Sequence, residues 1–309
     1  MDRATLLLPP RARFGAQRLA PLIARAIGQG DRQALAGTQR ARVFDLLPRG
    51  WPVAAITRQR DAGDAQLSAW SRADPAHVRP DINGARLLAH GDALGLSAAD
   101  CEAFLQPLRP LFGDAGFPID APVPSRWYLR LPREAKLPTF AEPEQALGAD
   151  LFEHLPEGPE GRRWRALLSE TQVVLHNHPL NARRAAEGRA PVNSLWFWGA
   201  GVLPDHVRTS FENIHSDDDA WQAFARAAGV TAPALPARLS PGPGSQAFDL
   251  RHFRDLAALQ ADWLAPALAA LQARTLREVA LDFEDGEGIT LRAAQRWRFW
   301  RRPIARLDA

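Results

Sequence analysis

The chain has 309 residues, of which 46% are hydrophobic and 24% charged, values that are typical of globular proteins and exclude a disordered chain. Every basic residue except Lys136 is an arginine, and the net charge of +3 is too small to indicate a polyanionic partner by itself. Cys101 is the only cysteine, which excludes an internal disulfide and a thiolate metal cluster. No run approaches the roughly 20 apolar residues of a membrane span. Because Leu6–Leu8 is also too short for the apolar region of a signal peptide, we expect a cytoplasmic protein.

Strands and helices are expected to alternate along the chain, judging from the spacing of apolar residues. Strands are predicted at Thr5–Leu8, Ala54–Thr57, Gly84–His90, Trp127–Leu131, Asn193–Trp198, Val279–Phe283 and Ile289–Leu291. Helices are predicted at Ala16–Ile27, Ser97–Leu108, Arg162–Leu175, Pro179–Glu187, Ser216–Ala228 and Leu250–Leu271. The alternation predicts an α/β fold with a mixed, mostly parallel sheet flanked by helices.

A stretch rich in proline and glycine, residues 231–246, interrupts the pattern. Such a composition favours a linker or a long surface loop. We therefore expect a main domain at residues 1–230. The C-terminal helix and hairpin, residues 247–309, are expected to pack on it.

The densest group of polar residues is the run HNHPLNARR, His176–Arg184. A helix that begins at Pro179 offers free backbone N–H groups and the positive end of its dipole to an anion. The candidate ligand-binding side chains of this run are Asn177, His178, Asn181, Arg183 and Arg184. Two interpretations remain open, since the amides and arginines can bind a phosphate or carboxylate, or can only cap the helix and face water.

A second candidate lies in Ser71–Asp81, which the two prolines of SRADPAHVRPD mark as a loop. Asp74, His77 and Arg79 are suited to proton transfer or to the orientation of a substrate. The alternative is a turn held by salt bridges.

Other polar clusters favour structural roles. His176 and His178 have the spacing of two ligands on a strand but lack further metal ligands nearby, and the acids of Asp217–Asp219 are explained by helix capping. We expect no metal site and no cofactor. The C-terminal stretch Arg296–Arg302 alternates arginine with aromatic residues. It fits packing on the domain better than nucleic-acid binding.

Four motifs in chain order resemble the RpfE-type regulatory proteins, which are also described as phosphoglycerate mutase-like. They are RADPAH at Arg72–His77, SRWYLRLP at Ser125–Pro132, LPEGPEGRRW at Leu155–Trp164, and the pair HPLNARR and NSLWFWGAG within His178–Gly201. The last pair is also similar to part of the archaeal-type cofactor-independent phosphoglycerate mutases, which belong to the alkaline phosphatase superfamily. The resemblance implies a degenerate alkaline-phosphatase-like core.

Enzymes of that superfamily use two metal ions held by Asp and His, and a strand near the N-terminus ends in an aspartate ligand. Here the corresponding stretch, TLLLPPRARF, contains no acid, and Asp205-His206 is the only adjacent Asp-His pair. The first hypothesis is therefore a non-catalytic regulatory or ligand-binding protein that recognises a small phosphorylated or carboxylated metabolite. The second is a mutase-like or phosphatase-like enzyme on a phosphomonoester. The third is a scaffold that binds a protein partner through its aromatic and arginine surfaces.

Overall fold

The computed structural model describes residues 2–81 and 84–308. These form two compact units, one of residues up to Arg49 and from Asp205 onward, the other Gly50–Pro204. The second unit is therefore an insertion in the sequence of the first. The boundary expected at residues 231–246 coincides with neither junction, since this stretch lies within the first unit.

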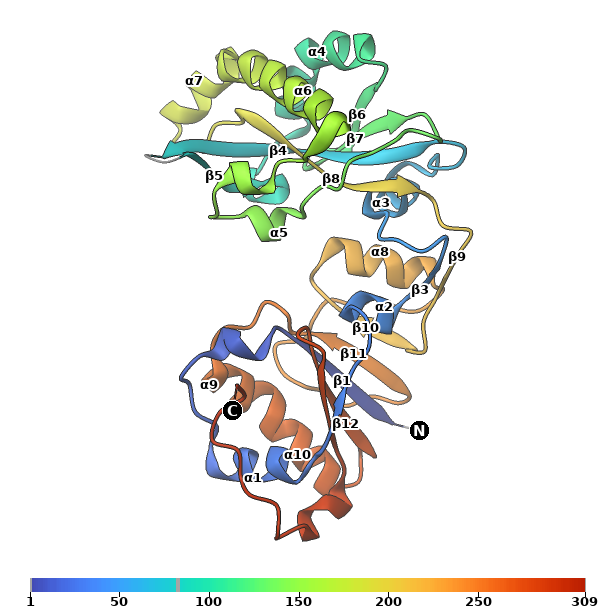
Figure 1. Ribbon diagram of the computed structural model, residues 1–309, viewed down its shortest axis with the longest axis vertical. Helices are drawn as coiled ribbons and strands as arrows, with labels where there is room; N and C mark the ends of the chain where they lie inside the picture. Colours follow the sequence, from blue (N-terminus) through green and yellow to red (C-terminus); the bar gives the residue numbers. More distant parts are fainter. Residues whose placement is uncertain (1, 82–83, 309) are drawn as a thin grey trace. The chain divides into compact units, whose positions relative to one another are not determined.

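The first unit is built on a mixed six-stranded sheet (Figure 1). Its strands are β1 (Arg3–Leu8), β2 (Asp31–Ala34), β10 (Asn213–His215), β11 (Ser245–Asp249), β12 (Glu278–Phe283) and β13 (Glu287–Leu291). In the order β10-β11-β1-β12-β13-β2, the first four strands are parallel and the last two pairings are antiparallel. Two short strands, β3 (Asp45–Leu47) and β9 (His206–Arg208), form a separate antiparallel pair.

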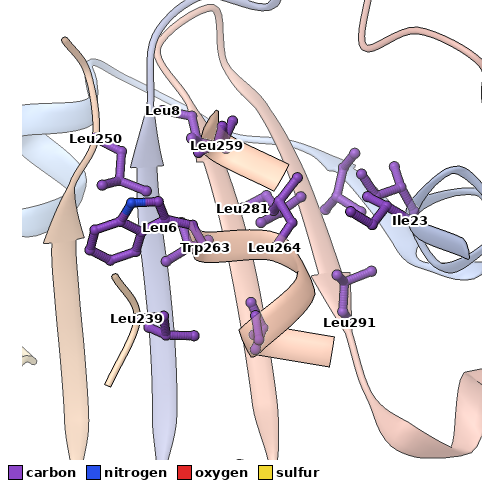
Figure 2. Packing of buried hydrophobic residues seen from close by; sticks show 14 of the residues in the cluster. Leu6, Leu8, Ile23, Leu239, Leu250, Leu259, Trp263, Leu264, Leu281 and Leu291 are labelled. Carbon is purple, nitrogen blue, oxygen red and sulfur yellow. The ribbon is translucent and has the colours of Figure 1, made fainter. Parts of the chain in front are cut away.

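Successive residues of these strands point alternately to the two faces of the six-stranded sheet. Leu6 and Leu8 belong to the buried cluster on one face, where they pack with Trp263 and Leu264 (Figure 2). The helices and helical turns of this unit are η1 (Arg11–Phe14), α1 (Pro21–Gln29), α2 (Gln39–Val43), α8 (Asp219–Ala227), α9 (Leu256–Leu259), the π-helical turn η4 (Gln260–Leu264), α10 (Ala265–Gln272) and η5 (Ala293–Trp297). The residues of β1 that point to the opposite face, Thr5 and Leu7, are also buried, so the sheet is covered on both faces.

The inserted unit contains an antiparallel sheet. Its strands are β4 (Ala69–Asp81), β5 (Gly84–His90), β6 (Ile119–Val123), β7 (Arg126–Leu131) and β8 (Ser194–Val202). The strand β4 is central, because β8 pairs along one edge while β7 and then β5 pair along the other. The expected α/β fold with a mixed, mostly parallel sheet is confirmed by the first unit, whereas the antiparallel sheet of the inserted unit was not expected.

Helices cover both faces of this sheet (Figure 1). On one face lie α4 (Ala98–Asp114), α6 (Gly158–His176) and α7 (Pro179–Ala186), and on the other α3 (Val53–Ala62) and α5 (Pro143–Ala146), with the turns η2 (Gly91–Leu94) and η3 (Leu151–His154). The α4 side holds the main core, which includes Phe104, Trp127 and Trp164. Cys101 is buried in this core, and burial raises the pKa of its thiol to about 11, as expected for a packed thiol.

The end of β8 shows why small residues follow the tryptophans. Gly199 has a φ of +61°, and a Cβ there would lie 2.9 Å from Cβ of Val53 at the start of α3. A Cβ on Gly201 would lie 2.7 Å from Cβ of Pro52. These glycines therefore allow α3 to pack closely on the strand, and this explains them without a nucleotide.

Several predicted elements are confirmed and others are wrong. The helix predicted at Ser97–Leu108 is confirmed as α4, and Ser97 and Asp100 form a capping box at its start. The strand predicted at Ala54–Thr57 is wrong, since these residues are helical in α3. The loop predicted at Ser71–Asp81 is also wrong, because the whole segment belongs to β4. Within the described residues, no helix combines the length and apolar character that crossing a bilayer requires.

Candidate functional site

The predicted run His176–Arg184 joins α6 to α7, and His178 caps the new helix. Its Nδ1 accepts a hydrogen bond from Leu180 N at 3.3 Å, while its Nε2 lies 3.1 Å from the carbonyl oxygen of Ala103. The ring thus donates from Nε2 to a carbonyl of α4 and accepts at Nδ1. Both ring nitrogens of His178 serve the helix junction.

Asn181 and Arg184 are buried within the same unit. The Asn181 amide donates to the carbonyl oxygens of Leu175 and Val192, each at 2.8 Å, and accepts from Val192 N at 2.9 Å. Arg184 is 1% exposed and donates to the carbonyl oxygens of Ala190 and Leu94. These contacts hold α7 against the segment that leads into β8, so both side chains have structural partners.

Among the candidate ligand-binding side chains of this run, Asn177 and Arg183 are exposed. Asn177 donates back to the carbonyl oxygen of Val173 in α6, and the Arg183 side chain is 64% exposed and forms an ion pair with Asp100 at 3.2 Å. Ligand binding by Asn177, His178, Asn181, Arg183 and Arg184 stays a prediction.

In β4, the predicted Asp74 is 1% exposed and lies in a polar cluster on the face of the sheet away from the main core. Arg72 donates to both carboxylate oxygens of Asp74, at 2.8 and 2.9 Å, and Trp198 Nε1 donates to one of them at 2.7 Å. The Arg72 guanidinium also lies over the rings of Trp198 and Tyr128. The carboxylate is thus fully engaged by donors from β4 and β8.

His90 adds a second titratable group to this cluster. It pairs with Ala76 across β4 and β5, which places it on the same face as Asp74. Burial lowers its pKa, and the charges of Asp74 and Arg72 act in opposite directions on it. Its Nδ1 is buried with no hydrogen-bond partner among the described residues, so the neutral ring is favoured.

His77 and Arg79 do not join this cluster. Alternation along β4 turns His77 to the face opposite Asp74. Burial lowers the pKa of His77, the positive charge of Arg79 lowers it further, and hydrogen bonds with Asn193 and Pro191 act in the opposite direction. Arg79 is exposed. Asp74 is therefore separated from His77 and Arg79, which share the opposite face of β4. A binding role for these three residues also stays a prediction.

A further polar site lies at the carboxyl ends of the parallel strands in the first unit. Leu7 of β1 is in register with Asp249 of β11 on one side and Asp282 of β12 on the other. Residues in register on parallel strands point to the same face, so the two carboxylates flank Leu7, two strand spacings or about 10 Å apart. Neither Asp249 nor Asp282 is among the candidate site residues predicted from the sequence.

Asp249 is 5% exposed and is held by Arg251. Arg251 Nε donates to Oδ1 at 2.7 Å and Nη2 to Oδ2 at 2.8 Å, and Ser216 Oγ donates to Oδ2 at 2.7 Å. Burial alone raises the pKa of Asp249, but the hydrogen bonds and charge of Arg251 outweigh this and lower it. Arg251 also lies over the ring of Trp221, 4.2 Å from its centroid.

Asp282 has an equivalent arrangement. Arg42 of α2 donates to its carboxylate from Nε at 3.0 Å and from Nη2 at 2.6 Å, and Gln39 Nε2 donates to Oδ1 at 3.2 Å. Gln39 Oε1 is buried without a partner among the described residues. Each carboxylate therefore has its own bidentate guanidinium.

Metal ions of the kind that the resemblance implies do not fit these residues. Both oxygens of Asp249 and of Asp282 are occupied by arginine donors, and an arginine cannot lose its charge to make way for a cation. Across residues 2–81 and 84–308, no group of three or more His, Cys, Asp or Glu side chains is placed to hold a metal ion.

Comparison with known proteins finds local similarity to phosphoglycerate mutases. The chain is 42% identical over 66 residues to a probable 2,3-bisphosphoglycerate-independent phosphoglycerate mutase of Geobacter sulfurreducens, a match that covers 21% of this chain and 16% of that protein. It is 42% identical over 62 residues to the corresponding mutase of Methanosarcina barkeri, covering 20% and 16%. The match thus spans less than a fifth of the length of these relatives. No known family profile matches the chain.

Among solved structures, the cofactor-independent phosphoglycerate mutase of Thermoplasma acidophilum aligns with 94% of this chain and 89% of its own, at 14% identity and a TM-score of 0.43. The first hypothesis, a non-catalytic regulatory protein, is contradicted by these comparisons, because the relatives named above are enzymes. The local similarity to the archaeal-type mutases is confirmed.

Proposed function

We propose that this chain is a phosphoglycerate mutase-like enzyme that acts on a small phosphorylated carboxylic acid. The observation that carries the proposal is its 42% identity with named phosphoglycerate mutases over 62 to 66 residues. Kinship with the alkaline-phosphatase-like fold and with the RpfE-type proteins belongs to the same proposal. This kinship is a proposal about common ancestry, and no regulatory role is proposed.

The carboxyl edge formed by β1, β11 and β12 is the place where we expect the substrate to bind. Open α/β sheets bind ligands beyond the carboxyl ends of their parallel strands. Here that edge carries two buried carboxylates, two rigid guanidinium groups and the hydroxyl of Ser216. A phosphorylated acid bears several negative charges, which arginine recognises in bidentate fashion. Arg42 and Arg251 supply the charge that balances the carboxylates and keeps the edge from repelling such a substrate.

Phosphorus NMR tests the activity directly, because it resolves 3-phosphoglycerate, 2-phosphoglycerate and inorganic phosphate. We expect the purified chain to convert 3-phosphoglycerate to one of the other two species. Samples with EDTA, magnesium and manganese are compared. If neither product forms in any of the three, the proposed activity is wrong.

The proposed location of the substrate site is tested with Arg42→Lys, which keeps a cation beside Asp282 but loses the planar bidentate contact. We expect turnover to fall at least tenfold. The matched control is Arg25→Lys on the exposed side of α1 in the same unit. Unchanged turnover in Arg42→Lys would place the reaction elsewhere in the molecule, while leaving the activity itself standing.

A second candidate function is binding of a protein partner through the C-terminal stretch. Trp297, Phe299 and Trp300 are 67%, 79% and 67% exposed, more than most large apolar side chains of a folded protein. The backbone beside them is anchored, since Gln29 Nε2 donates to the carbonyl oxygens of Arg296 and Arg298. In size-exclusion chromatography, the Trp297→Ala and Trp300→Ala double variant is expected to elute without the protein partner that the unchanged chain carries. Its melting temperature should equal that of the unchanged chain. An equal elution profile in both proteins would remove this candidate.

A further inference from the structure

The segment that follows η5 runs along α1 and is held there by close contacts (Figure 1). Ile304 N donates to the carbonyl oxygen of Ala24 at 3.0 Å. A Cβ on Gly28 of α1 would collide with the carbonyl oxygen of Arg302. Because a residue without a side chain stands at this point, the segment lies directly against the helix and its backbone is fixed.

The aromatic rings of this stretch do not share the burial of its backbone. The sequence predicts packing on the domain, yet the side chains of Trp297, Phe299 and Trp300 are 67%, 79% and 67% exposed, so that prediction is wrong for the rings. Together they expose on the order of 400 Å² of apolar surface, about half of what one partner contributes to a standard protein interface. The fixed backbone reduces the entropy that binding would cost.

Guanidinium groups beside the rings have no acid within the molecule to balance them. Arg296 lies over the ring of Trp297, 4.9 Å from its centroid. Arg301 donates from Nη1 to the carbonyl oxygen of Gly30 at 2.7 Å, a contact that leaves its charge unbalanced. Arg296 and Arg302 form no side-chain hydrogen bond or ion pair within residues 2–81 and 84–308.

The carboxylates that this stretch contacts are already paired. Asp31 of β2 forms ion pairs with Arg298 and with Arg292, the latter at 3.2 Å, and Asp308 lies 3.9 Å from Arg306. The surface is therefore apolar at its centre and positive around it, and charge complementarity requires an anionic partner.

The geometry of the rings favours one class of anionic partner. A second copy of the same surface would bring cations against cations. The planes of Phe299 and Trp300 lie at 83° to each other, so the two rings cannot both stack on the parallel bases of a nucleic acid. Insertion of Trp297 into a bilayer would carry the Arg296 guanidinium toward the hydrocarbon, which is costly. A protein surface has none of these conflicts.

We propose that the C-terminal patch, formed by Arg296, Trp297, Phe299, Trp300 and Arg302, binds an acidic protein segment that also carries apolar side chains. The inference rests on the second candidate function, protein binding, and adds the chemistry of the partner; it does not depend on the proposed enzymatic activity. The rings supply the apolar centre of the interface, where tryptophan and arginine contribute most of the binding energy. The guanidinium groups at the rim pair with carboxylates of the partner.

Fluorescence anisotropy with a fluorescein-labelled random copolymer of glutamate and tyrosine tests this patch, because the copolymer combines carboxylates with aromatic rings. We expect the chain to bind it, and to bind labelled polyglutamate roughly fivefold more weakly or less. Two double variants, Arg296→Gln with Arg302→Gln and Trp297→Ala with Trp300→Ala, should each weaken copolymer binding by roughly tenfold or more.

The matched control removes the same charge elsewhere in the first unit. Arg226→Gln with Arg238→Gln changes two exposed positions in the connection between β10 and β11, toward the other edge of the sheet. Its affinity for the copolymer should stay within about twofold of that of the unchanged chain. All substituted side chains are exposed, and equal melting temperatures check that every variant is folded.

Several results would overturn the inference. They are absence of copolymer binding, equal affinity for polyglutamate and the copolymer, and an equal loss of affinity in the control and in Arg296→Gln with Arg302→Gln. Tighter binding of an oligothymidylate would assign the patch to nucleic acid instead. Tighter binding of vesicles of phosphatidylcholine and phosphatidylglycerol would assign it to a membrane surface.

The outcome is separable from that of the second candidate function. A partner that the tryptophan double variant loses in chromatography, while the chain does not bind the copolymer, would keep protein binding and refute the acidic character of the partner. Copolymer binding that both double variants lose, with equal elution profiles in chromatography, would support the chemistry of the patch and remove a partner that copurifies. Neither result bears on turnover in the phosphorus NMR assay.

Discussion

Removing the Arg251 guanidinium is expected to leave Asp249 as a buried and unpaired charge. In Arg251→Ala the carboxylate loses two donors, at 2.7 and 2.8 Å, and keeps only Ser216 as a side-chain donor. Breaking a buried ion pair from one side costs about 3–5 kcal/mol. The Arg251 side chain is 24% exposed, so water can enter and the lower end of that range applies, about 3 kcal/mol.

Differential scanning calorimetry measures this cost. For a unit of about 150 residues, each kcal/mol lowers the melting temperature by roughly 2–4 °C, which predicts a fall of about 6–12 °C in the transition of the first unit. Arg226→Ala, at an exposed position on α8, is the control and should change the melting temperature by less than 2 °C, or about 0.5 kcal/mol.

The double variant Arg251→Ala with Asp249→Asn separates the charge from the packing. The neutral amide still accepts from Ser216 but has no charge to desolvate, so at least half of the lost stability should return. If the single variant melts like the Arg226→Ala control, or if the double variant is no more stable than the single one, the ion pair does not balance a buried charge.

Three further predictions concern the inserted unit. Trp198→Phe replaces the indole with a smaller phenyl ring and removes the donor to Asp74, and the lost hydrogen bond should cost about 1.5–3 kcal/mol in urea denaturation. In Trp196→Phe, which loses the same volume and a donor to a neutral carbonyl, the lost hydrogen bond should cost about 1 kcal/mol. Asn181→Ala removes three buried hydrogen bonds to the backbone and should cost about 3 kcal/mol in the same assay; a cost below 1 kcal/mol would contradict its structural role. Burial lowers the pKa of His90 in the folded state, so the unfolded chain takes up a proton first and stability should fall as pH drops below about 6.5. The urea midpoint should therefore fall between pH 7.5 and 5.5, and less so in His90→Gln.

Features set by neighbouring residues could be predicted from the sequence. The Ser97 capping box depends on residues three apart, and the hairpin of β12 and β13 on the turn between them. The prolines of β4 led to the wrong prediction of a loop at Ser71–Asp81, because a proline disrupts a strand only where its missing N–H is needed for pairing with a neighbouring strand. Arg72 is the last residue of β4 paired with β7 and Ala76 the first paired with β5, so Pro75 lies where that edge needs no N–H donor.

The polar clusters could not be predicted, because their partners are distant in sequence. Asp282 is neutralised by Arg42, and Asp74 is bonded by Trp198. In the sequence, Asp282 stands at the end of an apolar strand and Trp198 within an apolar run, without a polar partner nearby. Only the pairing of the strands brings each donor to its acceptor. Local motifs therefore indicate the run His176–Arg184, but they do not indicate the carboxyl edge of the parallel strands.

The place of β1 in its sheet has a consequence for synthesis of the chain. Leu6 is in register with Phe248 of β11 and with Leu281 of β12, so both neighbours of this apolar strand emerge long after it. At 5–20 residues per second the strand waits roughly 10 to 60 s, while the inserted unit, whose contacts lie within Gly50–Pro204, can already fold. Asp205 N donates to the carbonyl oxygen of Leu47, which ties together the two points where the insertion leaves and rejoins the first unit. The nascent chain is therefore most exposed to aggregation and to chaperones at its first strand, and a slower ribosome would lengthen that exposure.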